Sequence, residues 1–315
     1  MVDGWADSIT YLSILNTQNL KLIIMQIRFQ NSPKETSQMN TQQLRDNFLV
    51  QGLMQPGTIQ LVYSHYDRLI IGGVVPTNAL IKLPNEGELK ANFFLERREI
   101  GIINVGDAGI VVADGKEYFM DKLDCVYLGK GTKEVKFKSK NKIAPAAFYF
   151  LSTPAHHKYA NRMMKKEKAS PLNLGDISTS NKRTIYKYIH NDGIQSCQLV
   201  MGLTTLAAGS VWNSVPPHTH TRRMEAYFYF DVDAAQRVMH FMGEPQETRH
   251  LVVANNEAVL SAPWSMHFGV GTANYGFIWG MAGENLNYSD MDMVKPVSYT
   301  HLRAHETGRN LVCRL

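Results

Sequence analysis

The stretch that decides the fold is PPHTHTRRMEAYFYF, residues 216–230. His218 and His220 lie two positions apart, so on a strand both imidazoles point to the same face. Glu225 follows at the start of an aromatic run that is typical of a strand, and a turn through residues 221–224 can fold its carboxylate back beside the two imidazoles. Two imidazoles and a carboxylate on one sheet face predict a metal site.

A third histidine lies further along the chain. His267 follows His220 by 47 residues and lies in the strand-like segment SMHFGV, just after a turn at Pro263. A single histidine in a β protein is structural or exposed in most cases. Three imidazoles with one carboxylate, however, supply the nitrogen and oxygen ligands that suit Zn, Mn, Fe or Ni. We therefore expect His218, His220, Glu225 and His267 to bind one divalent ion.

The rest of the chain has the pattern of an all-β protein. Short runs rich in Val, Ile, Phe and Tyr, such as LIIGGVV, IGIINV and HLVVAN, are separated by turn segments such as VGDAG and ADGKE. Many short strands with regular turns predict a sandwich or a small barrel. Short helices are expected at residues 163–169 and within NTQQLRDNFL, residues 40–49.

A weak internal repeat predicts two similar units in tandem. LERREIGIINV opens the first repeat and HTRRMEAYFYFDV the second, and a similar segment follows each at a comparable interval. This alignment places Glu134 opposite His267, and the first repeat has no His-x-His before its Arg-Arg pair. We therefore expect a degenerate barrel without metal ligands at residues 25–160 and a metal-binding barrel at residues 161–296.

Both ends of the chain differ from the middle. Met25 opens a polar segment that leads into an apolar strand, so residues 1–24 are interpreted as a non-native extension. The composition changes abruptly at residue 297, and residues 297–315 are interpreted as a foreign tail. His301 and His305 in that tail are therefore left out of the metal site.

Composition excludes several classes of protein. The 315 residues carry a formal charge of +5 with no basic run interleaved with aromatics, which argues against nucleic-acid binding and suits a small anionic substrate. The apolar clusters of residues 10–25 are interrupted by polar residues, so neither a signal peptide nor a membrane helix is expected. Cys125, Cys197 and Cys313 are too scattered for a disulfide framework, which indicates a reducing, cytoplasmic compartment.

The histidine motifs resemble those of the cupin superfamily. Its first motif is His-x-His followed by Glu, which His218, His220 and Glu225 match, and its second is a Pro-containing turn followed by His, which His267 matches. Two departures occur: the glycine that closes the first motif is missing, and the upstream glycine, Gly209, lies further from the His pair than usual. Because these glycines shape turns, the ligand set is little affected.

Residues 25–296 resemble the 5-keto-4-deoxyuronate isomerase family more specifically. The resembling segments, which occur in the family's order, are VYSHYDRLIIGG, FFLERREIGIINVG, SPLNLGD, SNKRTIYKY, PPHTHTRRMEAYFYF, MGEPQETRH and FIWGMAGEN. The resemblance implies two cupin-like β-barrels (jelly-roll sandwiches) in tandem, one zinc ion on the four ligands named above, and a homo-hexamer. It also implies an aldose–ketose isomerisation of 5-keto-4-deoxyuronate to 3-deoxy-2,5-diketogluconate in pectin and galacturonate breakdown.

Further residues are expected to hold the substrate and move its proton. Alternation along the strand puts Tyr227 and Tyr229 on the same face as Glu225, so either tyrosine can orient the substrate. Glu225 or a hydroxide on the ion can act as base, and a metal-assisted hydride shift is a third option. Arg183 and Arg223 are candidate partners of the substrate carboxylate, although pairs such as Arg222-Arg223 are more often solvated turns.

The same period-two rule puts Phe277, Trp279 and Met281 on one face, inward or outward. His240 and His250 are interpreted as a surface or packing pair. Two other functional classes fit the local motif: an iron-dependent cupin oxygenase, and a sugar-binding cupin without catalytic activity.

Overall fold

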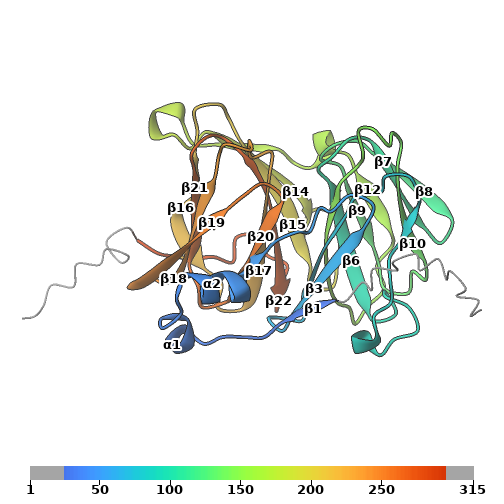
Figure 1. Cartoon of the computed structure of the whole chain (residues 1–315), viewed down its shortest axis with the longest axis horizontal. Helices are drawn as coiled ribbons and strands as arrows, with labels where there is room; N and C mark the ends of the chain where they lie inside the picture. The colour runs from blue at the N-terminus through green and yellow to red at the C-terminus, as the bar shows by residue number, and fades with distance from the viewer. Residues whose placement is uncertain (1–24, 296–315) are drawn as a thin grey trace, which may run out of the picture.

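The computed structural model describes residues 25–295 and consists of two β-sandwiches side by side (Figure 1). The predictions for residues 1–24 and 297–315, and Cys313, lie outside the described residues. An all-β fold with few helices is confirmed. The strands up to residue 164 are β1 (Gln26–Arg28), β2 (Leu49–Val50), β3 (Ile59–Ser64), β4 (Ile70–Val74), β5 (Ile81–Lys82), β6 (Arg98–Asn104), β7 (Gly109–Ala113), β8 (Lys116–Met120), β9 (Cys125–Leu128), β10 (Val135–Ser139), β11 (Phe148–Pro154) and β12 (Arg162–Met164).

The remaining strands are β13 (Leu172–Leu174), β14 (Arg183–Ile189), β15 (Val200–Leu206), β16 (Trp212–Thr219), β17 (Arg223–Phe230), β18 (Val238–Glu244), β19 (Glu247–Val253), β20 (Glu257–Ser261), β21 (His267–Gly271), β22 (Gly276–Gly283) and β23 (Asp292–Met293). The first sandwich packs the sheet β1-β3-β4-β11-β6-β9-β12 on the sheet β5-β10-β7-β8. The second packs the sheet β13-β14-β15-β22-β17-β20-β2 on the sheet β19-β18-β21-β16-β23.

One segment near the N-terminus packs on the second sandwich instead of the first. β2 pairs with β20, with Leu49 opposite Val259, so residues 33–50 belong structurally to the second sandwich, whereas β1 pairs with β3 in the first. Figure 1 shows α1 (Pro33–Thr36) and α2 (Thr41–Phe48) in blue beside the orange strands of that sandwich. The expected boundary at residue 160 therefore does not separate the two sandwiches completely, because residues 33–50 pack on the second one. The strand edge of β20 accepts β2 from this segment.

The helices follow local sequence signals only in part. α2 agrees with the helix expected within residues 40–49: Asn40 and Gln43 form a capping box that satisfies the first free backbone N–H groups. The helix expected at residues 163–169 is wrong. Met164 pairs with Cys125 in the sheet, and a single 3-10 turn, η2 (Lys166–Lys168), follows. Sheet pairing takes the backbone hydrogen bonds that a helix needs. The other 3-10 turns are η1 (Gly87–Leu89) and η3 (Ile177–Thr179).

The two seven-stranded sheets pack against each other between the sandwiches. Tyr149 of β11 stacks on Phe228 of β17 with ring centroids 4.2 Å apart, and both side chains are fully buried. Gly280 of β22 has no room for a side chain, because a Cβ there would collide with Leu151. The even-numbered residues of β17 thus face the first sandwich, and its odd-numbered residues face the interior of the second.

Candidate metal centre and pocket

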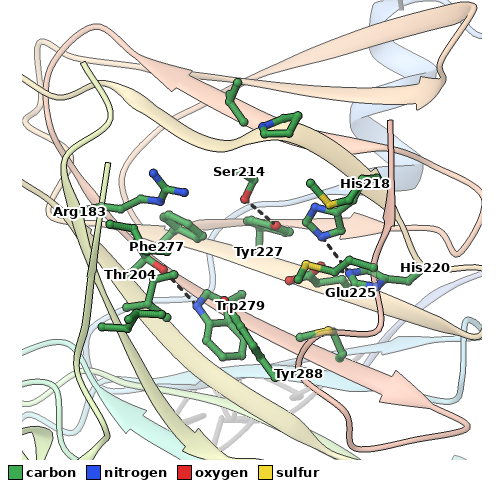
Figure 2. Close-up of a pocket in the computed structure, with 18 residues that line it drawn as sticks. Arg183, Thr204, Ser214, His218, His220, Glu225, Tyr227, Phe277, Trp279 and Tyr288 are labelled. Atoms are coloured by element: carbon green, nitrogen blue, oxygen red, sulfur yellow. Dashed lines mark hydrogen bonds and ion pairs between the residues drawn. The ribbon is translucent and has the colours of Figure 1, made fainter. Parts of the chain in front are cut away.

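Four side chains from both sheets of the second sandwich converge on one point, as Figure 2 shows for three of them. Glu225 comes from β17 in the seven-stranded sheet, whereas His218 and His267 are register partners on β16 and β21 of the five-stranded sheet. His220 follows the end of β16, at the turn that leads into β17. All four side chains are buried, and their ligand atoms lie within 4.8 Å of one another.

The ligand atoms are close enough to share one ion. The Nε2 atom of His218 lies 3.1 Å from the Nε2 atoms of His220 and of His267. Glu225 Oε2 lies 3.0 Å from His220 Nε2 and 2.8 Å from His267 Nε2. Three imidazole lone pairs and a carboxylate that converge without an intervening acid or hydroxyl make a cation-binding arrangement.

The opposite ring nitrogens of two ligands are held by the chain. His220 Nδ1 is 2.6 Å from the carbonyl oxygen of Asp290, and His267 Nδ1 is 2.9 Å from Ser261 Oγ. A hydrogen bond donated by Nδ1 fixes the tautomer in which Nε2 carries the lone pair. His220 is thus oriented to coordinate an ion through Nε2.

Burial opposes protonation of His218. It lowers the pKa of His218 to about 2, with His267 adding to the effect. Burial alone would raise the pKa of Glu225, but the neighbouring His267 and His220 outweigh it and hold that pKa well below its usual value. Neutral imidazole and ionised carboxylate are the protonation states that metal binding requires. The donor set therefore fits a divalent cation.

A cavity of about 280 Å³ opens beside this centre. It is mainly apolar, with a few polar groups among the aromatic and aliphatic walls, as is usual for small-molecule sites. Its lining residues are Leu172, Leu174, Arg183, Ile185, Thr204, Ser214, Val215, Pro216, His218, His220, Glu225, Tyr227, Phe277, Trp279, Met281, Tyr288, Met291 and Met293.

The two arginines expected at the substrate carboxylate have different surroundings. Arg183 lines the pocket, and Figure 2 shows it at the opposite end from His218 and His220. Its Nη1 donates to the Asn181 carbonyl at 2.9 Å, and no carboxylate of residues 25–295 pairs with it. Burial lowers the pKa of Arg183. One end of the pocket thus carries a guanidinium that has no counter-ion among residues 25–295.

Arg223 lies outside the pocket lining and is fully buried, so the expectation of a solvated turn is wrong for it. Its guanidinium donates to the carbonyls of Asn287 and Asp290 at 2.8 and 3.1 Å. Arg222 donates to the Asp290 carboxylate through Nε and Nη2. The pair anchors the segment at residues 285–290, whose Asp290 carbonyl in turn accepts from His220.

The two tyrosines expected near the substrate, Tyr227 and Tyr229, also have different surroundings. Tyr227 lines the pocket, and its hydroxyl lies 3.3 Å from Ser214 Oγ (Figure 2). Tyr229 lies deeper, and its hydroxyl is 2.7 Å from His240 Nδ1. His240 is fully buried, so a surface position is wrong for it and packing is confirmed, whereas His250 is exposed.

Phe277, Trp279 and Met281 all line the pocket, so the face that they share is the inward one. Sequence reasoning missed Thr204, Ser214 and Tyr288, because neither their residue types nor their spacing distinguishes them from other polar positions of the strands and loops. These three residues meet at the pocket only once the sandwich is complete, because Thr204 lies on β15, Ser214 on β16 and Tyr288 after β22.

Two β-sandwiches in tandem, with three imidazoles and a carboxylate converging inside the second, define a cupin fold with a candidate metal centre among residues 25–295. The chain belongs to the KduI/IolB family, whose model matches residues 48–295.

Individual relatives agree with this assignment. The 4-deoxy-L-threo-5-hexosulose-uronate ketol-isomerase of Halalkalibacterium halodurans is 52% identical over 271 residues, which is 86% of this chain and 98% of that protein. The enzyme of the same name from Shouchella clausii is 51% identical over 270 residues, 86% of this chain and 98% of its own length. The crystal structure of an IolB-like protein from Salmonella typhimurium LT2 superposes with a TM-score of 0.64 at 15% identity, covering 79% of this chain and 97% of that one. At that identity the match shows the fold.

Proposed function

We propose that this chain is a metal-dependent ketol-isomerase that converts 5-keto-4-deoxyuronate to 3-deoxy-2,5-diketogluconate. One observation carries the proposal: the cavity has a cation-binding cluster at one end and the unpaired guanidinium of Arg183 at the other. The substrate is a six-carbon acid with an aldehyde at C1 and a carboxylate at C6. The substrate therefore has its reacting group at one end and its negative charge at the other, which matches the cation-binding cluster and the Arg183 guanidinium at the two ends of the cavity. The relatives' shared name supports the same reaction.

Binding energy comes from both ends of the pocket. Arg183 binds the C6 carboxylate in a bidentate manner, which sets the direction of the substrate. The apolar walls around Phe277 and Trp279 pack on the carbon chain and exclude water from the reacting end. A divalent ion on His218, His220, Glu225 and His267 supplies Lewis acidity that makes the C2 proton easier to remove.

The chain's own groups move the proton. Glu225 is ionised and adjoins the pocket, so its carboxylate accepts the proton from C2 and returns it to C1. The O2 hydroxyl gives up its proton while O1 gains one, so that the aldehyde becomes a hydroxyl and C2 becomes the ketone. Burial keeps the pKa of Tyr227 well above its usual value, so its hydroxyl stays protonated and donates to a substrate oxygen. The Tyr229 hydroxyl is hydrogen-bonded to His240, and both rings pack against the ring of Tyr227, which helps to hold Tyr227 in place.

Zinc is the ion that we propose, because four nitrogen and oxygen ligands with fixed imidazole tautomers suit it. A cytoplasmic location, assembly as a homo-hexamer and a metal in the second sandwich alone are further parts of this proposal. The scattered cysteines support the first, the family resemblance supports the second, and the missing His-x-His in the first repeat supports the third. Of the described residues, none belongs to a helix that is long and apolar enough to span a bilayer.

The test is anaerobic incubation of purified protein with 5-keto-4-deoxyuronate, paired with metal analysis. We expect stoichiometric divalent metal, formation of the 2-ketose without oxygen, and loss of both in His218→Ala. His250→Ala, which removes an exposed histidine from β19 at the edge of the same five-stranded sheet, is the matched control and retains both. Turnover that requires oxygen would indicate the cupin oxygenase class, and bound metal without turnover would indicate a binding protein.

A further inference from the structure

The first sandwich contains a cavity of its own, of about 270 Å³, nearly the size of the pocket in the second. It lies where the ends of β6 and β11 meet the turn after β3. Three arginines surround it with one glutamate. Its lining residues are Tyr63, Arg68, Glu88, Leu89, Ala91, Phe94, Arg97, Arg98 and Pro154.

Arg98 is the decisive residue, because its side chain is only 7% exposed. Nε donates to Ser152 Oγ at 3.1 Å, and Nη2 donates to the carbonyls of Ser152 and Arg68 at 2.7 and 2.6 Å. Its Nη1 has no acceptor among residues 25–295, and no ion pair joins Arg98 to a carboxylate there. Burial lowers the pKa of Arg98 to about 10, still far above neutrality. The cavity wall thus carries a desolvated cation with a free N–H₂ group.

The corresponding arginine in the second sandwich has a different environment. Arg98 and Arg223 each begin the fifth strand of their seven-stranded sheet, β6 and β17. Arg223 lies within the electrostatic reach of Glu225 and Asp290. Glu99 is the one carboxylate whose charge acts on Arg98 among the described residues, and its two oxygens already accept five hydrogen bonds from other groups. Arg98 forms no hydrogen-bonded ion pair with it, so an anion in the cavity would offset part of the cost of burying the guanidinium.

The two other arginines supply charge at the mouth. Arg68 is exposed, and its side chain makes no hydrogen bond or ion pair with residues 25–295. Asp67 and Arg68 adopt the left-handed region with φ of 45° and 56°, and the Asp67 carboxylate accepts from Met224 N at 2.8 Å. The turn that presents Arg68 is therefore held in place. The Nη2 group of Arg97 donates hydrogen bonds to the carbonyl oxygens of Leu89 and Lys90, which fix its guanidinium beside the cavity.

We propose that this cavity is a second ligand site, which binds a small anion through a carboxylate or phosphate group held by Arg98 and Arg68. Guanidinium groups form paired N–H···O bonds with both kinds of oxyanion. Tyr63, whose ring lies 5.9 Å from the Arg98 guanidinium carbon, forms the adjoining wall. The site lies in the sandwich without metal ligands and does not depend on the isomerase activity.

The test is isothermal titration calorimetry of the full chain with two probes, inorganic phosphate and galacturonate. Arg68→Ala removes a cavity arginine whose side chain makes no hydrogen bond or ion pair with residues 25–295 and keeps the backbone carbonyl that accepts from Arg98, so the fold is retained. Lys142→Ala is the matched control: it removes one exposed charge near the opposite ends of the same strands. Arg183→Ala separates this site from the pocket of the second sandwich, and thermal melting of each variant reports folding.

We expect Arg68→Ala to weaken binding of at least one probe about tenfold or more, as the loss of a charge-assisted hydrogen bond predicts. Lys142→Ala and Arg183→Ala retain that binding, which weakens with added salt. A stronger effect of phosphate assigns the site to phosphorylated ligands, and a stronger effect of galacturonate assigns it to sugar acids. Equal binding by the wild type and Arg68→Ala, or loss of all binding in Arg183→Ala, overturns the proposal.

Discussion

A buried carboxylate joins the two sandwiches, and its removal gives a quantitative prediction. Glu99 lies on β6 of the first sandwich and is completely buried. Its oxygens accept from the hydroxyls of Tyr127 and Thr153 and from three backbone N–H groups at residues 197–199, which lead into β15 of the second sandwich. The perturbation is Glu99→Ala, which deletes the common acceptor.

The magnitude follows from the donors left behind. Three of the five are buried: the two hydroxyls and the N–H of Leu199. A buried donor without a partner costs about 1–3 kcal/mol, so these three sum to about 6 kcal/mol. Relief from burying the carboxylate offsets part of this sum. The net loss in free energy of unfolding is about 4 kcal/mol, and Glu99→Gln, which keeps one acceptor oxygen, loses about half as much.

The assay is urea unfolding followed by far-ultraviolet circular dichroism, which reports both sandwiches, and by tryptophan fluorescence, which among the described residues reports the second sandwich through Trp212, Trp264 and Trp279. Glu117→Ala is the matched control, because Glu117 is an exposed glutamate of the same sandwich, and its free energy of unfolding stays within about 0.5 kcal/mol of the wild type. A loss below about 1 kcal/mol for Glu99→Ala would refute the reasoning, because the donors would then have found other acceptors.

Three further predictions concern the site. Asp67→Ala removes the acceptor of the Met224 N–H beside Glu225, so the metal dissociation constant rises about tenfold, as the loss of one charge-assisted hydrogen bond predicts. Asp67→Asn retains an acceptor and returns the dissociation constant to the wild-type value, and a chelator-competition titration measures both variants. Arg183→Ala raises the KM for 5-keto-4-deoxyuronate about 10- to 100-fold with little change in kcat, and steady-state kinetics in which kcat alone falls would contradict a substrate-carboxylate role. Burial lowers the pKa of His240 to about 3, whereas the unfolded chain titrates near its usual value of about 6.5. Between these values the unfolded state binds the extra proton, so stability is full above about pH 6.5 and falls by about 1.4 kcal/mol per pH unit below it. Urea unfolding of metal-free protein at about pH 7 and about pH 5 therefore shows a shallower pH dependence in His240→Gln, and an unchanged slope would show that His240 is protonated in the folded state.

Local pattern was sufficient for the elements that repeat with a short period. The His-x-His spacing put His218 and His220 together, and alternation correctly placed Phe277, Trp279 and Met281 on one face. Turn residues and β-branched runs specify strands because they act within a few residues of one another. The capping box of α2 is likewise complete within its own first turn.

The roles of the buried charges depended on contacts between segments far apart in the chain. Nothing around Arg223 indicates that it is buried against carbonyls at residues 287 and 290, and nothing around Arg98 indicates a cavity. Glu99 reaches residues 197–199 only after both sandwiches have formed. The free energy of a charged group depends on the dielectric and the partners that the completed packing provides, whereas strand periodicity is written along the backbone itself. The sequence by itself therefore determined a double all-β fold and the four residues that converge at its candidate metal centre, and the tertiary structure decided which arginines are free to bind an anion.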